Sequence, residues 1–181
     1  PFYHNSGGGL TLSGGECMIY PEFCSELLKT AQSLSINTLV ETCGYFDYKR
    51  FQKEIIPYTD IVYYDLKIWD GSQHQAHCGK SNLRILDNFR SLIEDHHNTK
   101  LEILPRIPLV PGITAVDHNL RSLATFLRES NVKQVSLLPY NPLWPDKAKR
   151  LGYTSNFHSP GSMTQEEIAH CKSFFDGFIL V

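Results

Sequence analysis

The chain has 181 residues, of which 41% are hydrophobic, 12% aromatic and 20% charged. This length is near the ~150 residues typical of one domain, and the composition is that of a folded protein, so we expect a single domain over residues 1–181 and no disordered tail. A formal net charge of −2 argues against a nucleic-acid partner, and no apolar run approaches the ~20 residues of a membrane helix.

Short apolar strands alternate with helices in which apolar residues recur every three or four positions. The expected elements are strand 10–12, helix 21–35, strand 38–40, helix 47–56, strand 61–64, helix 82–95, strand 101–110, helix 119–129, strand 134–138, helix 165–175 and strand 178–181. This alternation predicts an α/β protein with parallel strands covered by helices. A (β/α) barrel and an open doubly wound sheet both fit the pattern.

Polar residues lie at or near the ends of five of these strands. They are Glu16, Glu41 with Thr42, Asp65 with Lys67, Arg106, and Tyr140 with Asn141. Ligands bind at the carboxyl ends of parallel strands in such folds. The pattern therefore predicts one shared site that is built from several βα units.

Two glycine-rich segments, Ser6–Gly9 and Leu12–Glu16, flank the first strand, and their glycines allow the backbone to approach a ligand closely. The second segment is also similar to the signature loop of ABC-type ATPases. That interpretation fails because the chain has no GxxxxGK[ST] phosphate loop.

The five cysteines form no CxxC pair and no zinc-ligand pattern. An odd number of cysteines without secretory features indicates free thiols in a reducing, cytoplasmic compartment.

The motifs SGGGLTLSGGE, ETCG, YDLK, RIPLVPG and LLPYN occur in this order between Ser6 and Asn141. In this order the motifs resemble those of the radical S-adenosylmethionine (SAM) activases of glycyl radical enzymes, the family of pyruvate formate-lyase activating enzyme. The resemblance covers most of residues 6–152, whereas residues 153–181, with the last helix and strand, match less clearly. It implies a partial (β/α) barrel of the radical SAM type, with its first strand missing.

The resemblance also implies the chemistry. A [4Fe-4S] cluster binds SAM and cleaves it reductively, and the 5′-deoxyadenosyl radical removes a hydrogen atom from a glycine of the partner enzyme. The implied partners are a glycyl radical enzyme, such as pyruvate formate-lyase, and an electron donor of the flavodoxin or ferredoxin type, in an anaerobic, cytoplasmic setting. No membrane or nucleic-acid partner is implied.

The resemblance carries the family's SAM contacts to particular residues. The implied cofactor-binding residues are Gly14, Gly15, Glu16, Glu41, Thr42, Asp65, Leu66, Lys67, Arg106 and Asn141. The backbone of Gly14–Glu16 would meet the methionine amine of SAM, and the Lys67 ammonium would pair with its carboxylate.

Some of these residues differ from the usual family pattern or allow a second role. In some members the residues that match Glu41 and Thr42 line, with the aspartate of the DLK motif, a cation site beside SAM; here Glu41 is one methylene longer than the usual aspartate. Asn141 stands where some members have a histidine near the ribose, and an amide can donate and accept hydrogen bonds. Arg106 matches a strand arginine that faces the barrel interior, and a structural ion pair is an equal alternative.

The family's cluster motif CxxxCxxC is absent from this chain. We therefore expect the chain to be the C-terminal part of an activase, with the cluster cysteines upstream, no catalytic or metal-binding residue of its own, and no activity alone. Two alternatives stay open: a radical SAM enzyme with another substrate, and a degenerate barrel that acts as a binding module.

Two structural expectations remain. Without its first strand, the strand at Leu10–Leu12 should be an unpaired sheet edge, with disorder or non-native association at residues 1–9. His96 and His97 should end a helix rather than bind a metal, and His74 and His77 should lie in a surface loop or helix that faces the partner protein.

Overall fold

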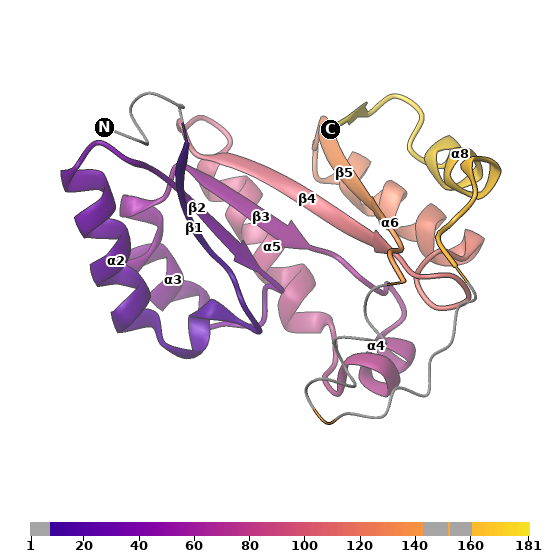
Figure 1. Ribbon diagram of the computed structural model, residues 1–181, viewed down its shortest axis with the longest axis horizontal. Coiled ribbons are helices and arrows are strands. Elements are labelled where there is room, and N and C mark those ends of the chain that lie inside the picture. Colours follow the sequence, from indigo (N-terminus) through magenta and orange to yellow (C-terminus); the bar gives the residue numbers. More distant parts are fainter. Residues whose placement is uncertain (1–7, 143–151, 153–160) are drawn as a thin grey trace. The chain divides into compact units, whose positions relative to one another are not determined.

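The computed structural model describes residues 8–142, 152 and 161–181 (Figure 1). Its strands are β1 (Gly9–Leu12), β2 (Asn37–Thr42), β3 (Ile61–Asp65), β4 (Glu102–Leu109), β5 (Gln134–Pro139) and β6 (Ile179–Leu180). Its helices are α2 (Pro21–Ser33), α3 (Tyr48–Glu54), α4 (Gly71–Cys78), α5 (Leu83–His96), α6 (Asp117–Glu129) and α8 (Gln165–Ser173), with 3-10 turns η1 (Cys17–Ile19) and η2 (Ile56–Tyr58).

The strand order follows the chain order, β1-β2-β3-β4-β5-β6. The pairs β1–β2, β2–β3, β3–β4 and β5–β6 are all parallel. Helices connect successive strands, which confirms the predicted α/β class with a parallel sheet and outer helices.

Internal contacts divide the chain into two compact units. The first comprises the chain up to Leu66 together with Asp70–Arg106, and the second comprises Lys67–Trp69 together with the chain from Ile107.

The core of the first unit lies between its sheet and α2, α3 and α5, which lie on the same side of β1–β3 in Figure 1. Tyr64 of β3 is fully buried there, with its ring edge-on to Phe46 and Phe89, and Phe46 stacks on Phe51. Side chains of a strand alternate between the two faces of the sheet. Alternate residues of β2 and β3 are accordingly buried against the helices, and the residues between them are only half-buried.

Two buried polar side chains tie helix α5 to β3 and to the turn that follows β2 in this unit. The Tyr64 hydroxyl donates to the carbonyl of Ile85 at 2.7 Å, and the Asn88 amide donates to the carbonyls of Gly44 and Phe46 at 2.9 Å each. Gly44 has a φ of +79°, and a Cβ at this position would lie 2.0 Å from the Tyr64 hydroxyl. Only glycine fits this turn.

In the second unit, α6 buries Leu120, Leu123 and Phe126, and Trp69 packs against Phe126 with ring centroids 5.4 Å apart. Helix α8 begins with a capping box in which the Thr164 hydroxyl accepts from the Glu167 backbone and the Glu167 carboxylate accepts from the Thr164 backbone.

Within the described part of the chain, strand β1 stands at the end of the strand order and pairs with β2, as expected for Leu10–Leu12 at a sheet edge. Of the residues expected to be disordered, 1–7 lie outside the described part of the chain, as do Ser6 and Gly7 of the glycine motif. No helix in the described ranges is long and apolar enough to cross a membrane.

The histidine predictions were partly right. His96 is the last residue of α5 and His97 caps it, as expected. His77 is exposed on α4, but His74 is buried, with its Nδ1 atom 2.6 Å from the carbonyl oxygen of Lys80. The surface prediction for His74 is wrong because α4 carries almost no apolar residues, so that the imidazole becomes its inward-facing group.

Candidate functional site

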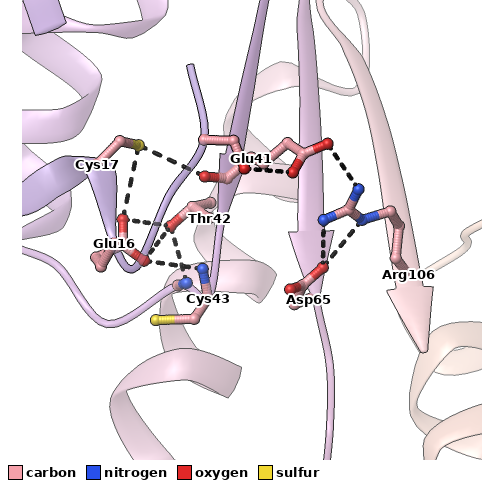
Figure 2. Close-up of polar contacts among 9 residues, drawn as sticks. Glu16, Cys17, Glu41, Thr42, Cys43, Asp65 and Arg106 are labelled. Carbon is pink, nitrogen blue, oxygen red and sulfur yellow. Dashed lines mark hydrogen bonds and ion pairs between the residues drawn. The ribbon is translucent and has the colours of Figure 1, made fainter. Parts of the chain in front are cut away.

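The end of β1 is tied to the end of β2 by the carboxylate of Glu16, which together with its donors we call the Glu16 cluster (Figure 2). The Thr42 hydroxyl lies 2.9 and 3.0 Å from the two carboxylate oxygens, and the backbone N–H of Cys43 donates to one of them at 2.8 Å. The backbone N–H of Met18 donates to the other at 3.1 Å, so Glu16 also caps η1. Protein donors therefore occupy both oxygens of Glu16.

Next to it lies a second group, the acid–arginine cluster of Glu41, Asp65 and Arg106 (Figure 2). The Arg106 guanidinium donates to Glu41 at 2.9 Å and, through two nitrogens, to one oxygen of Asp65 at 2.9 and 3.0 Å. All three side chains are largely buried, with exposed fractions of 14% for Arg106, 26% for Glu41 and 22% for Asp65. Charge-assisted bonds of this kind order the side chains strongly.

The second oxygen of Glu41 accepts a hydrogen bond from the Ser13 hydroxyl at 2.6 Å. Burial alone would raise the pKa of Glu41, but the bonds from Ser13 and Arg106 outweigh it and hold the pKa below its usual range. The Arg106 guanidinium also lies over the ring of Tyr63, 5.0 Å from its centroid. The cluster is thus a charged group held from four strands or loops.

The two clusters lie on opposite faces of the sheet although Glu41 and Thr42 are neighbours in β2. Glu41 pairs in register with Tyr63, two residues before Asp65, whereas Thr42 pairs with Tyr64 on the buried, helix-covered face. The loop after β1 joins them, because Ser13 binds one cluster and Glu16 the other. The thiol of Cys17 adds a further link, with contacts to Glu16 at 3.8 Å and to the Glu41 carbonyl at 3.5 Å.

Between these anchors, the loop presents the backbone of Gly14 and Gly15. No heavy atom lies within 4 Å of the place where a Cβ would stand on either glycine. Space is therefore open beside a loop that is fixed on both sides, which suits the close backbone approach to a ligand that the sequence predicted.

The second unit contains Lys67, Tyr140 and Asn141. Leu66, the residue that follows β3, belongs to the first unit. The segment that carries Lys67 is held by Asn119, a buried residue of α6. Its amide oxygen accepts from Trp69 N at 2.7 Å, and its amide nitrogen donates to the carbonyls of Lys67 and Thr114 at 3.0 and 2.9 Å.

The first unit thus carries five of the predicted side chains in two groups: Glu16 with Thr42, and Arg106 with Glu41 and Asp65. Sequence reasoning missed Ser13 and Asn119. Ser13 stands in the quoted glycine motif and could have been found there, whereas no local signal distinguishes Asn119 from any other residue at the start of a helix.

Comparison with known proteins sets this geometry in context. A choline trimethylamine-lyase activating enzyme of Oleidesulfovibrio alaskensis is 39% identical over 157 residues, which are 84% of this chain and 49% of that protein. A pyruvate formate-lyase-activating enzyme of Clostridium pasteurianum is 33% identical over 168 residues, 92% of this chain and 68% of that protein.

The chain belongs to the family of glycyl radical enzyme activating enzymes. It spans about half the length of most of the curated activating enzymes that it matches. A crystallised domain of a pyruvate-formate lyase-activating enzyme from Bacteroides vulgatus matches 96% of this chain and 98% of its own length, at a TM-score of 0.76 and 26% identity. A radical SAM methyltransferase from Sphaerobacter thermophilus shares the fold, at a TM-score of 0.56 and 16% identity. No family model matches the chain.

The iron–sulfur cluster expected for this activating-enzyme family does not fit the described residues. Such clusters are held by cysteine thiolates, and within residues 8–142, 152 and 161–181 no group of three or more histidine, cysteine or acidic residues could hold a metal ion. Burial, followed by the nearby Glu16 carboxylate, raises the pKa of Cys17 to about 12, so this thiol is a neutral hydrogen-bond donor. No step through a cluster is assigned to these residues.

Proposed function

We propose that this chain is the SAM-binding part of a glycyl radical enzyme activating enzyme, and that Gly14 and Gly15 form its contact with the methionine end of SAM. The observation that carries the proposal is the anchored loop at the carboxyl end of β1, with open space at both glycines. The glycyl radical enzyme itself and a flavodoxin- or ferredoxin-type electron donor are the proposed protein partners.

In this proposal the bound SAM supplies the radical chemistry, and the residues of the chain bind and orient it. The role of the Glu16 carboxylate is to hold the loop, because its two oxygens accept from the backbone N–H groups of Met18 and Cys43 and from the Thr42 hydroxyl. Lys67 and Asn141 are proposed SAM contacts on the resemblance alone, as is Leu66. We propose that the cluster cysteines belong to the full-length protein and that this chain alone is inactive.

The test compares two leucine substitutions in the full-length activating enzyme. Gly15→Leu should leave the melting temperature unchanged, because the side chain enters open space, but should weaken SAM binding at least about tenfold in calorimetry. The matched control is Gly161→Leu, at a second glycine with open space around its Cβ position, which should change neither quantity.

Two readouts decide between the activase and the alternatives. Formation of 5′-deoxyadenosine with a glycyl radical signal on the partner enzyme supports the activase. SAM binding that is equal in the wild type and in Gly15→Leu would refute the assigned contact, and an intact protein that binds no SAM would refute the function.

A further inference from the structure

The acid–arginine cluster bears on the cation site that the family resemblance implies at Glu41, Thr42 and Asp65. We infer that in this protein the guanidinium of Arg106 is the permanent counter-ion of Glu41 and Asp65, and that these residues bind no alkali metal ion. The inference deepens the proposed function, because that cation site would lie beside SAM. It rests on contacts within the first unit only.

Three of the four carboxylate oxygens of Glu41 and Asp65 already accept hydrogen bonds from protein donors. One oxygen of Glu41 accepts from Arg106 at 2.9 Å and the other from Ser13 at 2.6 Å. One oxygen of Asp65 accepts from two nitrogens of Arg106, at 2.9 and 3.0 Å. A metal ion would have to displace these donors.

The hydroxyl of Thr42 is committed elsewhere. It donates to Glu16 at 2.9 Å and accepts from the backbone N–H of Gly44 at 3.0 Å. Because Glu41 and Thr42 are adjacent in β2, their side chains point to opposite faces of the sheet. The three side chains therefore do not converge on one point.

The positive charge of Arg106 also disfavours a metal ion at this position. A metal ion placed between Glu41 and Asp65 would stand next to the positive charge of Arg106, and like charges at such short range repel strongly where little water screens them. Arg106 is itself held in place, since its guanidinium lies over the ring of Tyr63 and is mostly buried. Arginine is also always charged in proteins, so this counter-ion is present at every physiological pH.

The experiment measures the melting temperature of the 181-residue chain in potassium, sodium and choline chloride at equal ionic strength. The wild type should melt at the same temperature in all three salts. A cation bound with a Kd of about 1 mM would instead shift the folding equilibrium about 100-fold in 100 mM salt. A saturable rise with potassium or sodium that Glu41→Gln abolishes would overturn the inference.

Variants at Arg106 give the opposite test. Arg106→Met removes the guanidinium from Glu41 and Asp65. Its lowered melting temperature should therefore rise saturably with potassium or sodium but not with choline, whereas Arg106→Lys should stay insensitive. An Arg106→Met protein that responds to no metal cation would refute the claim that the guanidinium takes the place of one. If Arg106→Met does not fold, the wild-type salt series still decides.

The matched control is Arg50→Met. Arg50 also pairs with two carboxylates, Glu22 and Glu54, but its side chain is 38% exposed, against 14% for Arg106. Its loss should produce no metal-specific response. Because no measurement here uses SAM, the inference can fail while the proposed function stands, and the reverse is equally possible.

Discussion

Replacing Gly44 by alanine tests the link between the core and the loop after β1, which carries the proposed SAM contact. A methyl group at this position would stand 2.0 Å from the hydroxyl oxygen and 2.3 Å from the ring carbon of Tyr64, whose side chain is fully buried. Alanine must also adopt a φ near +79°. The backbone conformation costs about 1–2 kcal/mol, and overpacking of a core costs about 1–3 kcal/mol more.

Movement of Tyr64 would add to this cost. Its hydroxyl donates to the buried carbonyl of Ile85 at 2.7 Å, and loss of a buried hydrogen bond costs about 1–3 kcal/mol. We therefore expect Gly44→Ala to lower the free energy of unfolding by at least about 3 kcal/mol. Because the backbone of Cys43 donates to Glu16, the same substitution should loosen the Glu16 cluster.

The matched control is Gly79→Ala. Gly79 has nearly the same φ, +77°, but no heavy atom within 4 Å of its Cβ position, so only the backbone cost of about 1–2 kcal/mol should appear. Unfolding in urea should be followed by circular dichroism, since both tryptophans, Trp69 and Trp144, fall in the sequence of the second unit. Equal losses of stability for the two variants would refute the packing argument.

Three further predictions concern the site. Glu16→Gln should lower the free energy of unfolding in urea by about 1–3 kcal/mol, because the amide offers one acceptor oxygen to donors that bind two carboxylate oxygens in the wild type. The control Glu26→Gln, on the exposed surface, should lower it by less than about 0.5 kcal/mol. The lowered pKa of Glu41 contributes stability that is present above its unfolded pKa near 4.5 and is lost as the pH falls. The stability difference between the wild type and Glu41→Gln should therefore shrink on acidification. A difference that stays constant with pH would contradict this prediction. With a pKa of about 12, only about one Cys17 in 10⁴ is a thiolate at pH 8, so iodoacetamide should label the exposed Cys78 first, and mass spectrometry that finds equal labelling would contradict this.

The fold was predictable because the spacing of apolar residues along the chain indicates most of its helices and strands. Helix α5 was expected at 82–95 and lies at Leu83–His96, since its apolar residues recur at helical spacing. Helix α4 was not predicted, because it has no apolar face. Its end signals were present in the sequence: Asp70 caps it by accepting from Gln73, and Gly79 ends it in the left-handed conformation.

For the candidate site, the sequence predicted which side chains lie near the strand ends but not how they are arranged. The rule that strand ends share a rim identified Glu16, Glu41, Asp65 and Arg106, but it treated Glu41 and Thr42 as residues of a loop. Both lie within β2, so alternation sends them to opposite faces. An error of two residues in a strand boundary therefore changed one predicted cluster into two.

The two clusters are not independent, and the loop after β1 is the reason. Ser13 donates to Glu41, and Glu16 three residues later accepts from the end of β2, so the glycines between them are held on both sides of the sheet. Loss of the Arg106 charge would leave Ser13 as the remaining side-chain donor to Glu41. It would thus weaken the anchor of the loop at Ser13 and leave the anchor at Glu16 unchanged. The position of Gly14 and Gly15 thus depends on Arg106 of β4, which lies about 90 residues further along the chain. Local sequence patterns do not reveal this dependence.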